Sequence, residues 1–401
     1  APHRAHSTGR GTRTAGPGRG AGLLLRSGQR LLVVGLALAL ALVPRAAAAH
    51  ALLLGSDPAP DALLAAPPEA ISLTFTEAVI PVGQAIKVFS PTGRQVGGPA
   101  RSVGHVLMAP VIAAETGTYV VIWQVLAADT HPSRGAFGFV VGQPSANPYA
   151  PLLTGGAIGT ATPLGFGLQV LARWMHFLGV ALTFGIIAYQ VVIGREPRLR
   201  RLVGGGLALL IAAEPVALVA QLASLSFDGD TAIAVLAAGF GRLLGLRLAV
   251  ALLVWALLAL DSLWPVLALG VVMALIDGAT AHAIPGLPGA GVVLAAIHVS
   301  AIGIWVGGLA AFLVAPDRRF SRYAVAAAAV GVGSGLVLVV AHRGFPLTLP
   351  TTGYGWALVV KVVAVGAALT LAVFGRRRIE TGVMAVILAV AAVLVSLPPP
   401  R

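Results

Sequence analysis

The sequence contains no cysteine, which excludes disulfide bonds, thiolate metal sites and a cysteine nucleophile. Charged residues are also scarce: they make up 10% of the 401 residues, against about 25% in a soluble protein. Hydrophobic residues, by contrast, make up 57% of the chain. This composition indicates a protein that is mostly embedded in a membrane. The nine histidines and four methionines remain as candidate soft or borderline metal ligands.

Negative charge is the scarcer sign, and the formal net charge is +13. The positions of the arginines argue against a basic nucleic-acid-binding face. Seven arginines precede residue 46, and ten more lie in short clusters between apolar runs. That pattern is typical of targeting and of membrane orientation. We therefore expect the lipid bilayer, and no nucleic acid, among the partners.

The first 49 residues are predicted to be a targeting segment. Residues 31–43 are mostly aliphatic, arginines precede them, and four alanines follow at 46–49. This order is typical of a secretory signal, with cleavage after Ala49 and His50 as the mature N-terminus. The alternative is an uncleaved anchor. However, a helix over residues 31–43 would be only about 20 Å long, less than the hydrocarbon core of about 30 Å.

Residues 50–142 have the pattern of a small all-β domain. Short apolar stretches alternate with turn signals such as Asp57-Pro58 and Pro91-Thr92-Gly93. Residues 71–75, 119–125 and 137–141 alternate apolar and polar side chains. Strands at this spacing predict a β-sandwich or barrel. The proline- and glycine-rich residues 143–165 are predicted to be a linker.

From residue 166 to 397 the apolar runs are long enough for a polytopic all-α membrane domain of about eight transmembrane helices. The runs are 166–193, 202–223, 243–260, 263–283, 292–315, 324–341, 356–374 and 381–397. Runs three and four are separated only by Asp261 and Ser262, which predicts a tight hairpin. If the β-domain is outside, the arginine clusters at 195–201, 318–322 and 376–378 are inside, as the positive-inside rule requires. We therefore expect a multi-pass cell-membrane protein with an extracytoplasmic β-domain.

Three polar residues of the β-domain are candidate metal ligands. Asp129 and His131 are two apart, so on an extended chain they face the same way, and this pair suits Cu(II) or Zn(II). Alone, the pair is a weak motif and is more typical of a surface turn. Signal cleavage would add His50, which can chelate a metal through its α-amine and imidazole. Three nitrogens and one oxygen in a plane is Cu(II) geometry.

Residues 50–142 resemble the CopC family nearly from end to end. The resemblance is carried by Ser56-Asp57-Pro58-Ala59, Leu73-Thr74-Phe75-Thr76-Glu77, Gly117-Thr118-Tyr119, Asp129-Thr130-His131-Pro132 and Gly135-Ala136-Phe137-Gly138-Phe139. CopC proteins are secreted copper carriers of cupredoxin-like β-sandwich type. The resemblance implies that His50, Asp129 and His131 bind Cu(II). The methionine-rich Cu(I) site of some members looks absent, because this stretch has only Met108.

The membrane part resembles the CopD family, the integral membrane partner of CopC. Arg173-Trp174-Met175-His176-Phe177, Trp305-Val306-Gly307-Gly308 and Tyr354-Gly355-Trp356-Ala357 carry this resemblance. Polar side chains inside a bilayer are costly and need a partner or a function. The candidate residues of a membrane copper path are His176, Glu214, Asp277, His282, His298 and His342. The alternative for the charged ones is that Arg173, Glu214, Asp277 and Lys361 neutralise one another.

The leading interpretation is a copper acquisition protein and not an enzyme. The β-domain is expected to capture Cu(II), and the helical domain is expected to accept copper and import it toward the cytoplasm, with other copper-handling proteins as possible partners. Two alternatives stay open. Paired intramembrane histidines, with His176 and His298 as the candidates, would make the domain a haem-binding electron carrier or copper reductase. A copper tolerance scaffold without transport is the other.

Overall fold

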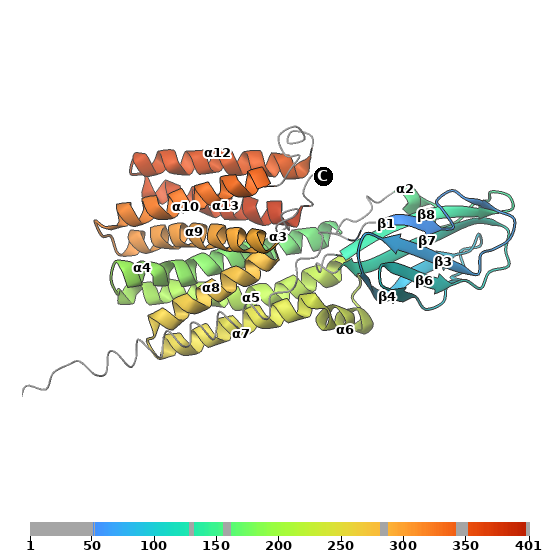
Figure 1. Ribbon diagram of the computed structural model, residues 1–401, viewed down its shortest axis with the longest axis horizontal. Coiled ribbons are helices and arrows are strands. Elements are labelled where there is room, and N and C mark those ends of the chain that lie inside the picture. Colours follow the sequence, from blue (N-terminus) through green and yellow to red (C-terminus); the bar gives the residue numbers. More distant parts are fainter. Residues whose placement is uncertain are drawn as a thin grey trace, which may run out of the picture.

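The computed structural model describes residue 51 and residues 53–127, 132–154, 162–280, 288–341 and 352–397. Its strands precede its long helices in the chain, and Figure 1 shows a β-sandwich at one end of an elongated helical bundle. This arrangement confirms the predicted combination of an all-β domain with an all-α membrane domain.

The sandwich consists of two four-stranded sheets. One sheet has the order β1-β3-β6-β5, with the strands Leu53–Asp57, Ala70–Phe75, Val106–Pro110 and Arg101–Val103. The other has the order β2-β8-β7-β4, with the strands Leu63–Leu64, Pro132–Val141, Gly117–Ala127 and Val79–Phe89. The predicted strands at 71–75, 119–125 and 137–141 thus lie within β3, β7 and β8.

The core between the sheets follows from the alternating side chains of β7. Tyr119, Val121, Trp123 and Val125 are all fully buried, as expected for a strand with one face on a core. The Trp123 ring packs edge-to-face on Phe75, with centroids 5.2 Å apart. Gly135 is paired with Trp123 across β7 and β8, and a Cβ there would lie 2.7 Å from the indole ring. Only glycine leaves room for this tryptophan.

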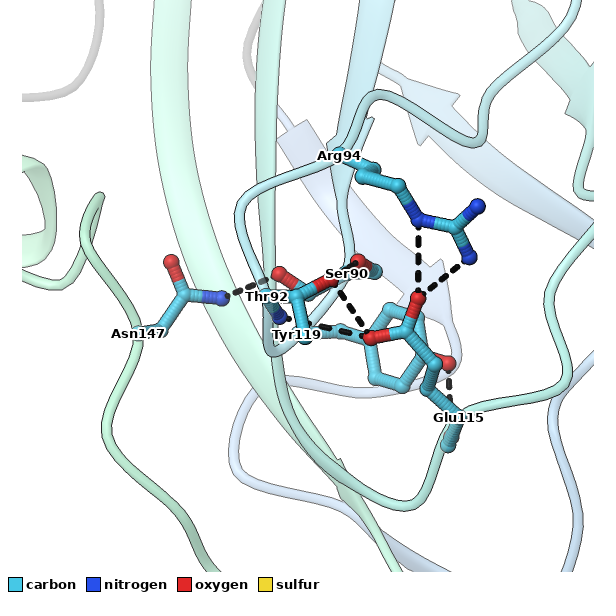
Figure 2. Close-up of polar contacts among 6 residues, drawn as sticks. All are labelled: Ser90, Thr92, Arg94, Glu115, Tyr119 and Asn147. Carbon is cyan, nitrogen blue, oxygen red and sulfur yellow. Dashed lines mark hydrogen bonds and ion pairs between the residues drawn. The ribbon is translucent and has the colours of Figure 1, made fainter.

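A polar network closes the end of the sandwich where β7 begins (Figure 2). The Tyr119 hydroxyl donates to the carbonyl of Glu115 at 2.6 Å, a tyrosine corner of the kind found in β-sandwiches. The Glu115 carboxylate accepts hydrogen bonds from Arg94 at 2.5 Å and from the Thr92 hydroxyl at 2.8 Å. The Arg94 guanidinium, helped by Thr92, lowers the pKa of Glu115 to about 2.

The first part of the predicted linker packs on this same end. The Asn147 amide donates to the carbonyls of Ser90 and Thr118 at 3.0 and 2.8 Å. Tyr149 stacks on Phe89 with ring centroids 3.8 Å apart. A short helix, α2 (Pro151–Thr154), follows. Prolines signal a break in regular structure, but they do not say whether the segment packs against a domain.

The helical part begins at Pro163. Its helices are α3 (Pro163–Val180), a π-helical turn (Ala181–Gly185), α4 (Ile186–Val192), a 3₁₀ turn (Pro197–Leu199), α5 (Arg200–Ser224), α6 (Gly229–Ala237), α7 (Gly239–Ala259), α8 (Leu263–Ala279), α9 (Pro288–Val314), α10 (Phe320–Ala341), α12 (Gly353–Val373) and α13 (Arg377–Ser396). Each of the eight predicted runs corresponds to one helical rod, α3 and α4 forming the first.

The described residues contain seven helices that are long and apolar enough to cross a membrane, which identifies this part as a multi-pass membrane domain. The predicted eighth, α8, has 17 residues and is shorter than the others. Its predicted run continued to residue 283, but the helix ends at Ala279. The hairpin between α7 and α8 forms as expected, with Asp261 at a positive φ of 54°.

Two features of the bundle were not predicted. One is α6, which the sequence analysis treated as a loop. The other is the π-helical turn within the first rod, where α9 approaches very closely. A Cβ on Gly307 would lie 2.0 Å from the Ala181 carbonyl, so the contact requires glycine. Small residues that let backbones approach in this way are typical of packed membrane helices.

The three arginine clusters lie together at the end of the bundle away from the sandwich. The Arg319 guanidinium donates to the carbonyl of Ile193, at the end of the first rod. The Arg377 guanidinium lies over the Phe320 ring, 5.5 Å from its centroid. Arg195 donates to the carbonyl of Asp261 in the α7–α8 hairpin at 3.3 Å. All the loops predicted to be inside are therefore on one face of the membrane domain.

The sandwich rests on α6 at the opposite end. Val82 of β4, Leu126 of β7 and Ala238 after α6 form one buried apolar cluster, with Leu225 and Ala234 packed against it. Asp228 begins α6 by accepting a hydrogen bond from the Thr231 amide at 2.7 Å. The end of β7 that leads toward residue 128 thus contacts the helical domain.

Candidate metal centre

The predicted Cu(II) ligands His50, Asp129 and His131 lie outside the described residues, as do His282 and His342 of the predicted membrane path. The structure describes the residues that flank the first three, and it describes His176, Glu214, Asp277 and His298 themselves.

Two described residues that follow His50 and His131 closely in the sequence are in direct contact. The Ser133 hydroxyl donates a hydrogen bond of 2.8 Å to the Ala51 carbonyl, although these residues are 82 positions apart. Ala51 and Ser133 are both buried. The strand β1 belongs to one sheet, and β7 and β8 belong to the other, so the contact between Ala51 and Ser133 is made across the sandwich.

The pairing of β7 and β8 shows where the described chain stops and resumes around Asp129 and His131. Leu126 pairs with Pro132 as the last pair of the antiparallel ladder, and Ala127, the last residue of β7, still pairs with Val79 of β4. Asp129 and His131 fall in the sequence between these two strand ends, and β8 then leads to the Ala51–Ser133 contact. The ligand set of His50, Asp129 and His131 itself stays a prediction.

The second candidate site lies inside the helical bundle and is centred on His176 of α3. Its Nε2 atom lies 3.0 Å from Oδ2 of Asp277 in α8, and its Nδ1 atom lies 3.6 Å from Oε1 of Glu214 in α5. The other carboxylate oxygen of Asp277 accepts a hydrogen bond of 2.8 Å from Arg247 in α7. His176, Glu214 and Asp277 are all buried. Three of the six predicted path residues thus meet at one point.

These side chains border a cavity of about 150 Å³ between the helices. Polar residues on its wall include Gln169, Arg173, Gln221 and Thr280, and the rest of the wall is mostly apolar. Arg173 and Arg247 balance the charges of Glu214 and Asp277, so the charges on the wall sum to zero with His176 neutral. A cation can therefore occupy the cavity without strong repulsion from the wall.

Arg247 is a member of this site that the sequence analysis missed. The available signal was a charged residue in the middle of an apolar run, which always needs a partner in a membrane. The alternative, in which Arg173, Glu214, Asp277 and Lys361 neutralise one another, is met only in part. Asp277 is paired with Arg247 instead, Arg173 borders the cavity and donates to the Ser396 hydroxyl at 2.7 Å, and Lys361 is not among the residues that line it.

His298 is not part of this cluster. Its Nδ1 atom lies 2.9 Å from the Gly331 carbonyl of α10 and 3.2 Å from the Ser334 hydroxyl. Ala295 and Val299 of α9 line the cavity, whereas His298 does not and contacts α10 instead. His176 and His298 therefore do not face each other, and the pair proposed as haem ligands is not brought together.

Within the described ranges, no three His, Asp or Glu side chains are placed so that they could hold one metal ion. At His176, one oxygen of Asp277 contacts the imidazole and the other accepts from Arg247. Nδ1 of His176 and the carboxylate of Glu214 remain as the candidate ligands for a metal in the cavity.

Comparison with known proteins shows the protein family to which the β-sandwich belongs. The model of the CopC domain matches residues 53–142. Copper resistance protein C of Xanthomonas campestris pv. juglandis is 30% identical over 113 residues, which cover 26% of this chain and 88% of that protein. The chain belongs to the CopC family. The match ends where the sandwich ends, so the CopC family describes only the N-terminal part of the chain.

Solved CopC-type structures are also similar to this part. CopC from Methylosinus trichosporium OB3b is 29% identical, with 25% of this chain and 100% of that chain covered and a TM-score of 0.22. PcoC, a methionine-rich copper resistance protein from Escherichia coli, is 28% identical, with coverages of 23% and 99% and a TM-score of 0.21. The helical remainder fits a CopD-like domain, so a CopC domain and a membrane domain are joined in one chain.

Proposed function

We propose that this CopC-family protein captures Cu(II) outside the membrane and passes copper through its helical domain toward the cytoplasm. The observation that carries the proposal is the docking of the sandwich on the bundle. Leu126, near the end of β7, is buried against Ala238 beside α6. The connection that contains Asp129 and His131 begins two residues later, so capture would take place next to the membrane domain.

The ligand set of the capture site is His50, with its α-amine, Asp129 and His131. The hydrogen bond from Ser133 to the Ala51 carbonyl supports it, because it brings the chain next to His50 and the chain next to His131 together. Nitrogen ligands with one carboxylate suit Cu(II). The name of the relative, copper resistance protein C, agrees with a role in copper handling.

The orientation follows from the arginines. All three arginine clusters gather at the end of the bundle away from the sandwich, as the Arg319–Ile193 and Arg377–Phe320 contacts indicate. Basic loops stay on the cytoplasmic side of a membrane. This rule supports an extracytoplasmic sandwich, from which copper that entered the helical domain would move inward.

Capture is tested with a fragment that begins at His50 and ends at Thr154, so that it includes the packed residues Asn147 and Tyr149. With a free N-terminus it is expected to bind one Cu(II) tightly. One extra residue ahead of His50, or His131→Ala, is expected to weaken binding at least 100-fold, since each removes a ligand. His105→Ala, at an exposed histidine of the same domain, is the matched control. Equal binding by the extended fragment would contradict the amine ligand.

Import is tested with the purified full chain in proteoliposomes loaded with a copper chelator. Uptake of labelled copper that depends on His131 supports the proposal. Tight Cu(II) binding without uptake would contradict import and would leave a copper tolerance scaffold as the function.

A further inference from the structure

The buried imidazole of His176 is held in one orientation by its neighbours. Oδ2 of Asp277 lies 3.0 Å from Nε2, while Oδ1 accepts from Arg247 at 2.8 Å. Arg247 also donates to the Thr280 hydroxyl at 3.3 Å, and that hydroxyl donates to the Asp277 carbonyl at 2.8 Å. A carboxylate paired with arginine is an acceptor, so we assign the ring proton to Nε2. The lone pair of a neutral His176 is then on Nδ1.

This second nitrogen has no hydrogen-bond partner in the described part of the chain, although His176 is only 5% exposed. The nearest polar atom is Oε1 of Glu214, 3.6 Å away, and Glu214 is itself only 3% exposed. With a neutral ring, a lone pair and a carboxylate oxygen face each other in a site of low dielectric, and a proton or a metal cation between them would satisfy both. A buried polar atom without a protein partner needs an explanation, of which a bound water or ion is one.

The cavity supplies the space for that cation. Both side chains border it, and its 150 Å³ can hold an ion with several waters, since about 10–15 Å³ measured in this way is enough for one water. The carboxylate–histidine pair has the form that proteins use to orient a metal-binding imidazole, in which one ring nitrogen donates to a carboxylate and the other binds the metal.

We propose that Nδ1 of His176 and the carboxylate of Glu214 hold a copper ion in transit, with water as the remaining ligands, and that Asp277 and Arg247 position His176 without touching the metal. This inference rests on the proposed function and assigns roles within the predicted path. Two protein ligands bind less tightly than the larger ligand set of the capture site, as a site that must release its ion requires. His298, which faces Gly331 of α10, has no role in this site.

The groups facing His176 could instead form a closed structural network. The charged residues are Asp277 of α8, Glu214 of α5, Arg247 of α7 and, on its own helix, Arg173. In that case the cavity would bind no metal, and substitutions there would change only stability. In such a network a protonated His176 would pair with both Asp277 and Glu214. The distance of 3.6 Å between Nδ1 and Oε1 of Glu214, beyond hydrogen-bond length, and the adjoining cavity favour the metal site.

The experiment uses the full chain in detergent with His131→Ala, so that the capture site is impaired. Cu(II), and separately Cu(I) kept reduced with ascorbate, are titrated by equilibrium dialysis, and the coordination is measured by X-ray absorption. One weaker copper site with a single imidazole ligand is expected in at least one oxidation state. His176→Gln or Glu214→Gln in this background should lower its affinity at least 10-fold, and Asp277→Asn should lower it about 10- to 100-fold.

The matched control is His298→Gln, which also removes a membrane histidine and should leave the affinity unchanged. Size-exclusion elution and thermal unfolding of each variant show that it is folded. The inference is overturned if His131→Ala leaves no copper site, or if folded His176→Gln and Glu214→Gln bind as the parent does. It is also overturned if His298→Gln removes the site. These results leave the proposal of Cu(II) capture by the β-domain unaffected. That proposal is tested separately, by the effect of His131→Ala on Cu(II) binding to the otherwise unaltered chain.

Discussion

Ser133 donates a hydrogen bond of 2.8 Å to the carbonyl of Ala51, which joins the chain beside the predicted N-terminal ligand to the strand that follows the Asp129–His131 connection. The bond is buried, so its loss leaves an unsatisfied carbonyl. It joins described residues that lie close in sequence to His50 and to His131.

Ser133→Ala is therefore expected to lower both stability and copper affinity. An unsatisfied buried acceptor costs about 1–3 kcal/mol, and the Cu(II) affinity of the His50–Thr154 fragment should fall several-fold as Ala51 loses its tether. Urea unfolding and Cu(II) titration measure the two effects. Ser133→Thr, which keeps the hydroxyl, is the control. An unchanged affinity in a destabilised Ser133→Ala variant would show that the contact does not position His50.

The Glu115 network should make the β-sandwich less stable in acid. The pKa of Glu115 is lowered to about 2 from an ordinary value of 4.5. A lowered pKa means that the carboxylate stabilises the fold above pH 4.5, and that this contribution is lost as the pH falls through 2. Glu115→Gln should thus lower the melting temperature of the fragment at pH 7 and make no difference near pH 2. Glu69→Gln serves as the control. A Glu115→Gln difference independent of pH would contradict this account.

Docking on α6 should be needed for transfer but not for capture. Ala238→Glu places a charge in the cluster of Val82 and Leu126 and should separate the sandwich from α6. Uptake into proteoliposomes is expected to fall at least 10-fold, with Cu(II) binding unchanged. Ala237→Glu, at the exposed neighbouring position, should behave as the parent. Equal uptake by the two variants would mean that copper reaches the membrane domain without docking.

Arg247 and Asp277 should behave as a coupled pair. Arg247→Gln leaves a buried carboxylate without its ion-pair partner, and breaking such a pair costs about 3–5 kcal/mol. We expect a lower yield of folded protein and a lower melting temperature in detergent. Adding Asp277→Asn should restore much of that stability, because the double variant has no unpaired charge. Additive losses in the double variant would show that the two residues act independently.

The β-sandwich and the helical domain were both predicted well from the sequence. Each is marked by a pattern of apolar residues along the chain, which can be recognised before the packing of the elements is known. Alternation in residues 119–125 identified β7, and long apolar runs located every membrane helix within a few residues. The short helix α6 was missed, although Asp228 with Asp230 in the first turn is a recognisable helix start. A nine-residue apolar helix between two long runs carries too little periodicity to stand out.

The candidate sites were predictable in part. The sequence singled out His176, Glu214 and Asp277, since polar residues inside a membrane are energetically costly and are usually paired or functional. It could not show that they meet, that Arg247 completes the group or that His298 faces α10 instead. Those facts depend on the rotation and crossing of six helices, α3, α5, α7, α8, α9 and α10, and on close contacts between them such as Gly307 with Ala181.

The most direct test of copper import by this chain is uptake of labelled copper by proteoliposomes that contain the full protein, compared with His131→Ala and with folded His176→Gln. We predict chelator-trapped uptake in the parent, a strong loss in His131→Ala at low external copper, and loss in His176→Gln at all copper concentrations while Cu(II) capture stays intact. Uptake no greater than in protein-free liposomes, with tight Cu(II) binding retained, would contradict import.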